Sequence, residues 1–151
     1  MSQFCGMHRP PRAGVDQIDS AAAALAVIRL AVHQPLRAEV IVLVLDADRR
    51  GRTVVIIDGT DEPDSVLEVV ERLAESVADS EHGAALVVAS VRPSSGPLDG
   101  DDQRWMEARD LAEDFGVELL EWFVISDDTG PPTAWCPRDL LAEAPRWPRA
   151  S

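Results

Sequence analysis

The chain contains two kinds of apolar pattern, which separate its expected helices from its expected strands. In three segments, at 21–32, 63–78 and 103–115, apolar residues gather on one helical face, with spacings of three and four where the pattern is clearest. Asp19 or Ser20 is the expected cap of the first helix. These segments predict three helices.

Short runs that are apolar and rich in β-branched residues predict buried strands. The run at 39–46 is too apolar to be an edge, so we expect a central strand that a turn joins to a second strand at 53–57. Further strands are expected at 84–89, 117–125 and 133–135, with a final helical turn at 138–143. The order helix, two strands, helix, strand, helix, strand, strand predicts an α/β fold with a mixed sheet packed by helices.

Length and hydrophobic content indicate a single domain. The chain has 151 residues, of which 46% are hydrophobic, enough for one substantial core and too few for two ordinary domains. We expect residues 1–15 to form a flexible N-terminal arm, 16–144 the domain and 145–151 a C-terminal tail.

The charge balance disfavours nucleic acid as a partner. Aspartate and glutamate number 27 against 14 basic residues, all of them arginine, for a formal net charge of -13. The arginines are scattered, whereas a protein that grips phosphates needs them concentrated. The lack of lysine also excludes Schiff-base chemistry and a Walker-type phosphate loop.

Cysteine usage and hydropathy favour a cytoplasmic protein without membrane contact. Cys5 and Cys136 are far apart and form no CxxC motif, which fits a reducing compartment. The apolar run at 40–45 is far too short to span a bilayer, and the first residues lack a signal-peptide core.

Three segments carry a recognisable motif pattern. Glu39 to Asp46 has the spacing E-x-x-V-L-x-L-D, and Gly59-Thr60 follows the expected hairpin. A strand rich in alanine and valine then runs into Ser90-Val-Arg-Pro-Ser-Ser-Gly. Together these segments resemble the RadC branch of the JAB/MPN metalloprotease family over nearly the whole domain. The resemblance implies a JAB/MPN-like mixed sheet flanked by helices, with a cytidine-deaminase-like architecture.

Intact relatives bind zinc with the two histidines of an H-x-H-P-S-G motif and a later aspartate. Here Ser90 and Arg92 stand at the histidine positions, and Asp101 or Asp102 matches the aspartate. Serine is a poor zinc ligand, and an arginine cannot bind zinc because it has only donors and stays protonated. The vestigial site Glu39, Ser90, Arg92 and Asp102 is therefore expected to hold no metal. Glu39 then has no zinc-bound water to deprotonate.

The vacated site raises the question of what balances its carboxylates. We expect Arg92 to take the electrostatic place of the metal by pairing with Glu39 and with Asp101 or Asp102. The alternative left open is that Arg92 points to solvent and Glu39 is merely an acid at the strand edge.

The resemblance, with its zinc ligands lost, implies a non-catalytic, protein-binding or scaffolding domain with no cofactor, whose partner is another protein or a second copy in a homodimer. His33, which ends the first helix, and His82, at the opposite end of the strand from Ser90, are not expected to restore the zinc site. One alternative is an active metal-dependent peptidase or isopeptidase, as in the intact family. A second, suggested by the name of the RadC family, is an accessory protein in DNA repair.

Two further features have competing interpretations. Trp147, in the tail, can contact a partner or dock onto its own domain. Asp127-Asp128 could bind a hard cation, but without an EF-hand spacing the pair is expected to start a β-turn. Asp99, Asp101 and Asp102 are likewise expected to favour the start of the third helix through its dipole.

Overall fold

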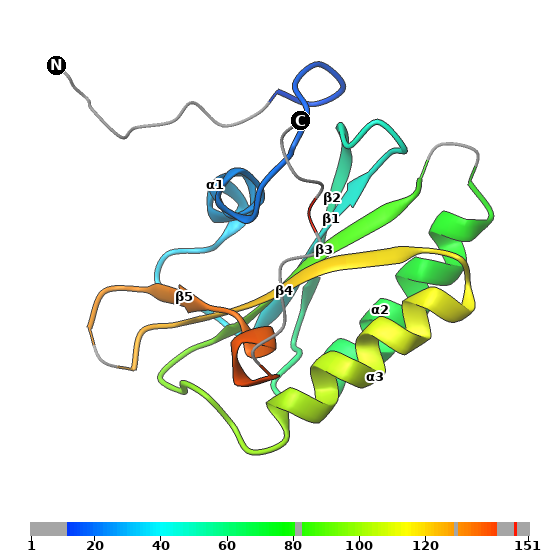
Figure 1. Cartoon of the computed structure of the whole chain (residues 1–151). Coiled ribbons are helices and arrows are strands. Elements are labelled where there is room, and N and C mark those ends of the chain that lie inside the picture. The colour runs from blue at the N-terminus through cyan, green and yellow to red at the C-terminus, as the bar shows by residue number, and fades with distance from the viewer. Residues whose placement is uncertain (1–11, 81–82, 129, 142–146, 148–151) are drawn as a thin grey trace, which may run out of the picture.

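The computed structural model describes residues 12–80, 83–128, 130–141 and 147. The predicted order of elements and the mixed α/β class are confirmed (Figure 1). The elements in chain order are α1 (Ala21–Ala31), β1 (Glu39–Leu45), β2 (Gly51–Asp58), α2 (Ser65–Ala78), β3 (Ala85–Arg92), α3 (Asp101–Asp114), β4 (Glu118–Ser126), β5 (Thr133–Trp135) and a short 3-10 helix η1 (Pro137–Leu141).

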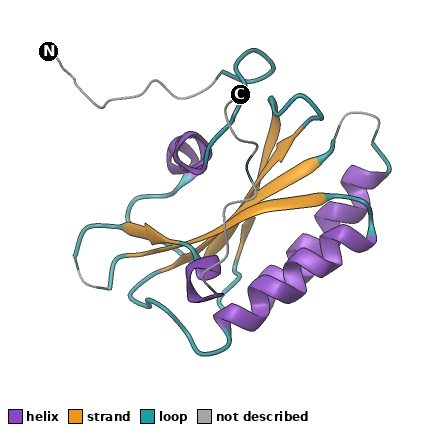
Figure 2. Ribbon diagram, in the orientation of Figure 1, coloured by secondary structure: helices purple, strands orange, loops and turns teal. Residues whose placement is uncertain are grey.

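The strands form one mixed sheet in the order β2-β1-β3-β4-β5. β1 is antiparallel to both β2 and β3, β3 is parallel to β4, and β5 is antiparallel to β4. Every residue of β1 is buried, as expected of a central strand. Figure 2 shows α2 and α3 side by side on one face of the sheet and α1 on the other.

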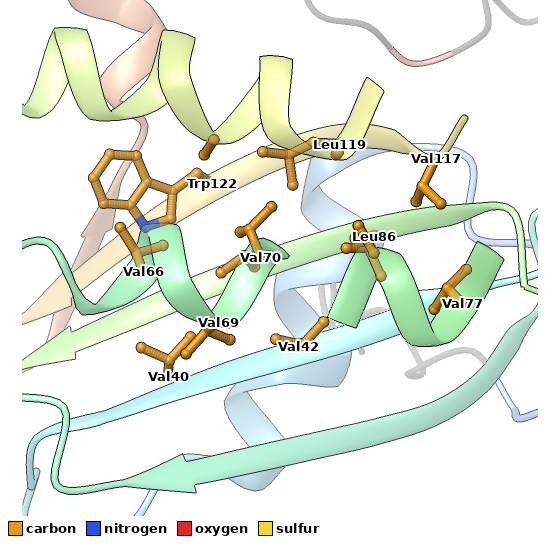
Figure 3. Close-up of a cluster of buried hydrophobic side chains, with 14 of the residues drawn as sticks. Val40, Val42, Val66, Val69, Val70, Val77, Leu86, Val117, Leu119 and Trp122 are labelled. Atoms are coloured by element: carbon orange, nitrogen blue, oxygen red, sulfur yellow. The ribbon is translucent and has the colours of Figure 1, made fainter. Parts of the chain in front are cut away.

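The face under α2 and α3 holds the larger of two hydrophobic clusters. The valines of α2 recur at spacings of three and four, so one side of the helix packs onto alternate residues of the strands. Figure 3 shows this packing of helix side chains onto the sheet, for which the labelled residues are Val40, Val42, Val66, Val69, Val70, Val77, Leu86, Val117, Leu119 and Trp122.

The opposite face is covered by α1 and by residues from both ends of the described chain. The Ser20 hydroxyl accepts a hydrogen bond from the Ala23 N–H at 3.1 Å, which confirms one of the two expected caps of α1. Ile28 of α1 is fully buried, and Trp147 is 9% exposed in the same cluster. Trp147 therefore docks onto its own domain, one of its two expected positions.

Most element boundaries differ from the sequence prediction by one or two residues, and the largest difference is at the end of β3. β3 continues through Ser90 to Arg92, where a loop was expected from residue 91. The part of the predicted N-terminal arm that is described is tied to the hairpin, because the Gly14 N–H donates to the Gly51 carbonyl at 2.9 Å. In the described residues no helix combines the length and the apolar character needed to cross a membrane.

Candidate functional site

The candidate site lies where β3 ends and α3 begins. Successive side chains of a strand alternate between faces, so Ser90 and Arg92 both point toward the α2–α3 side. Arg92 donates from Nη1 and Nη2 to the two carboxylate oxygens of Asp101, at 2.9 and 2.8 Å. The Asp101 side chain is fully buried and that of Arg92 is only 10% exposed. The pair is therefore a bidentate ion pair largely removed from water.

Asp101 also accepts hydrogen bonds from two other donors. The Leu98 N–H donates to it at 2.9 Å and Arg104 Nη1 at 3.0 Å. Burial by itself would raise the pKa of Asp101, but the hydrogen bonds from Arg92, Leu98 and Arg104 outweigh it and hold that pKa below its usual value. Asp101 is therefore an ionised carboxylate at neutral pH.

A second group of contacts fixes Ser90 and the Arg92 guanidinium. Trp122 of β4 donates its indole N–H to the Ser90 hydroxyl oxygen at 2.9 Å. The Arg92 guanidinium carbon lies 5.7 Å from the centre of the Trp122 ring, a cation–π distance. Trp122 is buried in the core, and its contacts with these two residues were not anticipated from the sequence.

A small pocket opens beside this cluster, with a volume of about 120 Å³. It lies between the end of β3 and the start of α2, and Ser90, Arg92 and Thr60 contribute to its wall. The Thr60 hydroxyl is buried and has no hydrogen-bond partner among the described residues. Pockets for drug-sized ligands are roughly 300–1,000 Å³, so this one has room for only a few water molecules or a small group.

Glu39 does not join this cluster, so the predicted Arg92–Glu39 pair is wrong. In the sheet Glu39 lies directly opposite Val91, and opposed residues of neighbouring strands point to the same face. Val91 belongs to the cluster under α1, whereas Arg92, the next residue, points the other way. Glu39 and Arg92 therefore lie on opposite faces of the sheet. The alternative in which Arg92 points to solvent is also wrong.

Glu39 has partners of its own on the α1 face. The Arg37 guanidinium lies 2.7 Å from His33 Nε2, and because it can only donate, Nε2 accepts. The opposite ring nitrogen then carries the proton and donates to Glu39 at 2.8 Å. The fully buried Glu39 is thus a hydrogen-bonded acid rather than an unpaired one at the strand edge. The short sequence separation of His33 and Glu39 was the available signal.

The acidic residues near α3 and β5 fall into distinct roles. The structure selects Asp101 over Asp102, which is half-buried and outside the Arg92 pair. Both lie in the first turn of α3, as the dipole argument predicted. Asp127 accepts the Ser94 N–H at 2.8 Å, and its carbonyl accepts the Gly130 N–H at 3.4 Å, which supports the expected turn.

A third buried acid was missed by the sequence analysis. Glu121 of β4 is fully buried, and Arg138 Nε donates to its two oxygens at 2.9 and 2.8 Å. Burial raises the pKa of Glu121, and Arg138 offsets only part of this increase. Burial and the Glu121 charge also raise the pKa of the Cys136 thiol to about 12. A glutamate inside an otherwise apolar strand was the signal, because such a side chain needs a buried partner.

Comparison with known proteins gives no family for this chain, because no protein-family model and no curated protein matches its sequence. Within the described ranges, no group of three histidine, cysteine, aspartate or glutamate side chains could hold a metal ion. His82, as well as Cys5 and the rest of the predicted arm up to residue 11, lies outside the described residues.

Proposed function

We propose that this chain is a RadC-like JAB/MPN domain that has lost its zinc site and acts as a protein-binding module rather than a hydrolase. One observation carries the proposal: at the position expected for the zinc ligands, Arg92 and Asp101 form a buried bidentate ion pair. A guanidinium supplies the positive charge that a metal would supply, but it offers no open coordination position and cannot activate water.

The donor set does not fit zinc. A zinc site needs ligand atoms with free lone pairs aimed at one point. The Ser90 hydroxyl accepts the Trp122 N–H, and Asp101 already accepts bonds from three residues. Glu39, the expected base, lies on the other face of the sheet. An active peptidase of the JAB family would require all of these groups to be rearranged.

A role in protein binding is supported by apolar side chains that the fold leaves exposed. α1 has the sequence AAAALAVIRLA, apolar on nearly every side, yet Leu30 is 73% exposed. Val54 and Ile56 on β2 are 38% and 41% exposed. A helix that is apolar all round is usually buried, and exposed apolar side chains close together are typical of contact surfaces.

Restoring the two histidines tests the family assignment. The double variant Ser90→His/Arg92→His would present two imidazoles on one face beside Asp101. We expect it to bind about one zinc ion per chain tightly, whereas the wild type retains none after mild chelation. The measurement is the metal content of purified, folded protein, with circular dichroism to confirm the fold.

The matched control is Ser90→His alone. It adds one imidazole at the same place but keeps the Arg92–Asp101 ion pair, so it should bind zinc only weakly. A wild-type protein with one chelatable zinc per chain would overturn the loss of the metal site. A folded Ser90→His/Arg92→His variant that binds no better than the control would overturn the JAB/MPN assignment.

A further inference from the structure

β2 forms one edge of the sheet and is open to further pairing. It pairs with β1 on its inner side, and from Thr53 to Asp58 no strand among the described residues pairs with its outer side. Only its first residue is covered, by the bond from the Gly14 N–H to the Gly51 carbonyl. Alternate N–H and C=O groups of this strand therefore face outward without a strand partner.

The side chains of β2 do little to discourage pairing. Proteins usually protect an edge strand with a proline, a central bulge or an inward-pointing charge. The stretch 53–57 reads Thr-Val-Val-Ile-Ile, all strand-favouring residues, and the one irregularity in its pairing with β1 lies before Thr53. Exposed strands of this composition associate readily with other strands.

Opposite charges stand at the two ends of this apolar stretch. Arg52 and Asp58 are 42% and 63% exposed. Asp58 lies opposite Glu39 and so points to the α1 face. Arg52 lines a groove on that face with Val27 and Val54. Positive and negative ends on one face make the strand complementary to an antiparallel copy of itself.

We propose that β2 pairs antiparallel with β2 of a second copy of this chain, about a two-fold axis at Val55. This register places Arg52 opposite the partner subunit's Asp58 and Val54 opposite the partner subunit's Ile56, each pair occurring twice by symmetry. The two sheets join into one continuous sheet, and both α1 helices lie on the same side of it. The proposal names the partner for the binding role proposed above and rests on it.

The α1 side supplies the rest of the contact area. A stable dimer buries about 800 Å² on each subunit, more than the edge of one short strand provides. The apolar groove beside β2, about 140 Å³ in volume, is walled by Val27 of α1 and by Val54. Val27 therefore extends the apolar surface from the strand edge onto α1.

Charge reversal tests both the register and the partner. In Arg52→Asp each interface contact sets two aspartates against each other, and in Asp58→Arg it sets two arginines. We expect each variant alone to raise the dimer Kd at least about tenfold, as measured by sedimentation velocity. Mixed in equal amounts, the two variants again place opposite charges together and should form a heterodimer with a Kd near that of the wild type.

The controls separate the interface from effects on folding. Arg52 contacts the half-buried Asp46 only at 3.9 Å, and Asp58 contacts the exposed Arg37 at 3.6 Å; such long or exposed pairs contribute little to stability. The matched control reverses the exposed Glu68–Arg72 pair on α2 and should leave the dimer unchanged. Thermal melting of every variant confirms that the fold is retained.

The outcomes separate this proposal from the proposed function. A wild type that stays monomeric at about 100 μM, or a mixture that forms no heterodimer, overturns the dimer. A monomer whose β2 amides are strongly protected from hydrogen exchange also overturns it, since another segment of the same chain then covers the edge. If the wild type is monomeric and binds no zinc, the dimer proposal is rejected but the proposed loss of the zinc site stands. A zinc-binding dimer would instead overturn the loss of the metal site.

Discussion

Asp101 and Glu121 are both fully buried and both bound by arginine, yet their environments shift their pKa values in opposite directions. Asp101 accepts two bonds from Arg92, one from Arg104 and one from a backbone N–H. Glu121 accepts bonds to both oxygens from the single Nε of Arg138. Burial raises the pKa of both carboxyls, but only at Asp101 do the hydrogen bonds outweigh it and favour the charged form.

The largest effect is expected from removing Arg92. Arg92→Ala takes away two hydrogen bonds and the main counter-charge of Asp101, and loss of one partner from such a pair typically costs about 3–5 kcal/mol. Denaturant unfolding monitored by circular dichroism measures the change in the free energy of unfolding. Arg72→Ala, which removes an exposed pair on α2, is the control and should cost at most about 1 kcal/mol. A loss for Arg92→Ala no larger than that of the control would contradict the role of the pair.

The pH dependence of stability should differ in sign between the two acids. The pKa of Asp101 is lowered by folding, so its stabilisation is present above the unfolded value of about 3.9 and is lost as pH falls through the folded pKa. The pKa of Glu121 is raised, so its contribution is full below about 4.3 and is lost as pH rises through the folded pKa. Unfolding free energies of the wild type and Glu121→Gln, measured from pH 4 to pH 7, test this.

Between pH 4 and pH 7 the stability of the wild type relative to Glu121→Gln should fall as pH rises, by about 1 kcal/mol for each unit by which the pKa is raised. Asp101→Asn is the comparison variant. Over the same range the stability of the wild type relative to Asp101→Asn should not fall, because the folded pKa of Asp101 lies below this range. Parallel curves for all three proteins would show that the two carboxylates do not differ as described.

The smallest effect is expected at Cys136, whose thiol reactivity reports on the charge of the nearby Glu121. With a pKa of about 12, its thiol forms little thiolate at pH 8 and should react with a disulfide reagent about 10³-fold more slowly than in unfolded protein. The measurement uses a Cys5→Ser background. Glu121→Gln removes a nearby negative charge and should speed the reaction several-fold, whereas Asp101→Asn should not. Equal reaction rates in these two variants would show that the Glu121 charge does not raise the pKa of the Cys136 thiol.

Much of the fold could be predicted because local patterns and tertiary packing agree. The valines of α2 recur at helical spacing, and β1 is too apolar to lie anywhere but the centre of the sheet. The end of β3 was missed because Ser90 and Arg92 are polar and precede a proline, a pattern typical of a loop. Their burial depends on contacts with Trp122 and Asp101, which lie outside β3 and so outside its local pattern.

The site was only half predictable, for a reason of strand geometry. The pair of Arg92 with Asp101 or Asp102 was expected because the resemblance puts these residues where intact relatives bind zinc, and the structure contains the pair with Asp101. The Arg92–Glu39 pair failed because side-chain direction depends on the register of β1 against β3, which sequence spacing does not reveal. The buried Glu121 is paired with Arg138. This pair could not be predicted because it depends on how η1 packs against β4.

The bridge made by Arg104 has a consequence for how the domain opens. Arg104 on α3 bonds Asp64, just before α2, at 2.8 Å, as well as Asp101, which in turn holds Arg92 at the end of β3. These linked ion pairs connect the start of α2, the first turn of α3 and the end of β3. Local unfolding of either helix would have to break it, so α2, α3 and the end of β3 should exchange their amide hydrogens as one cooperative unit.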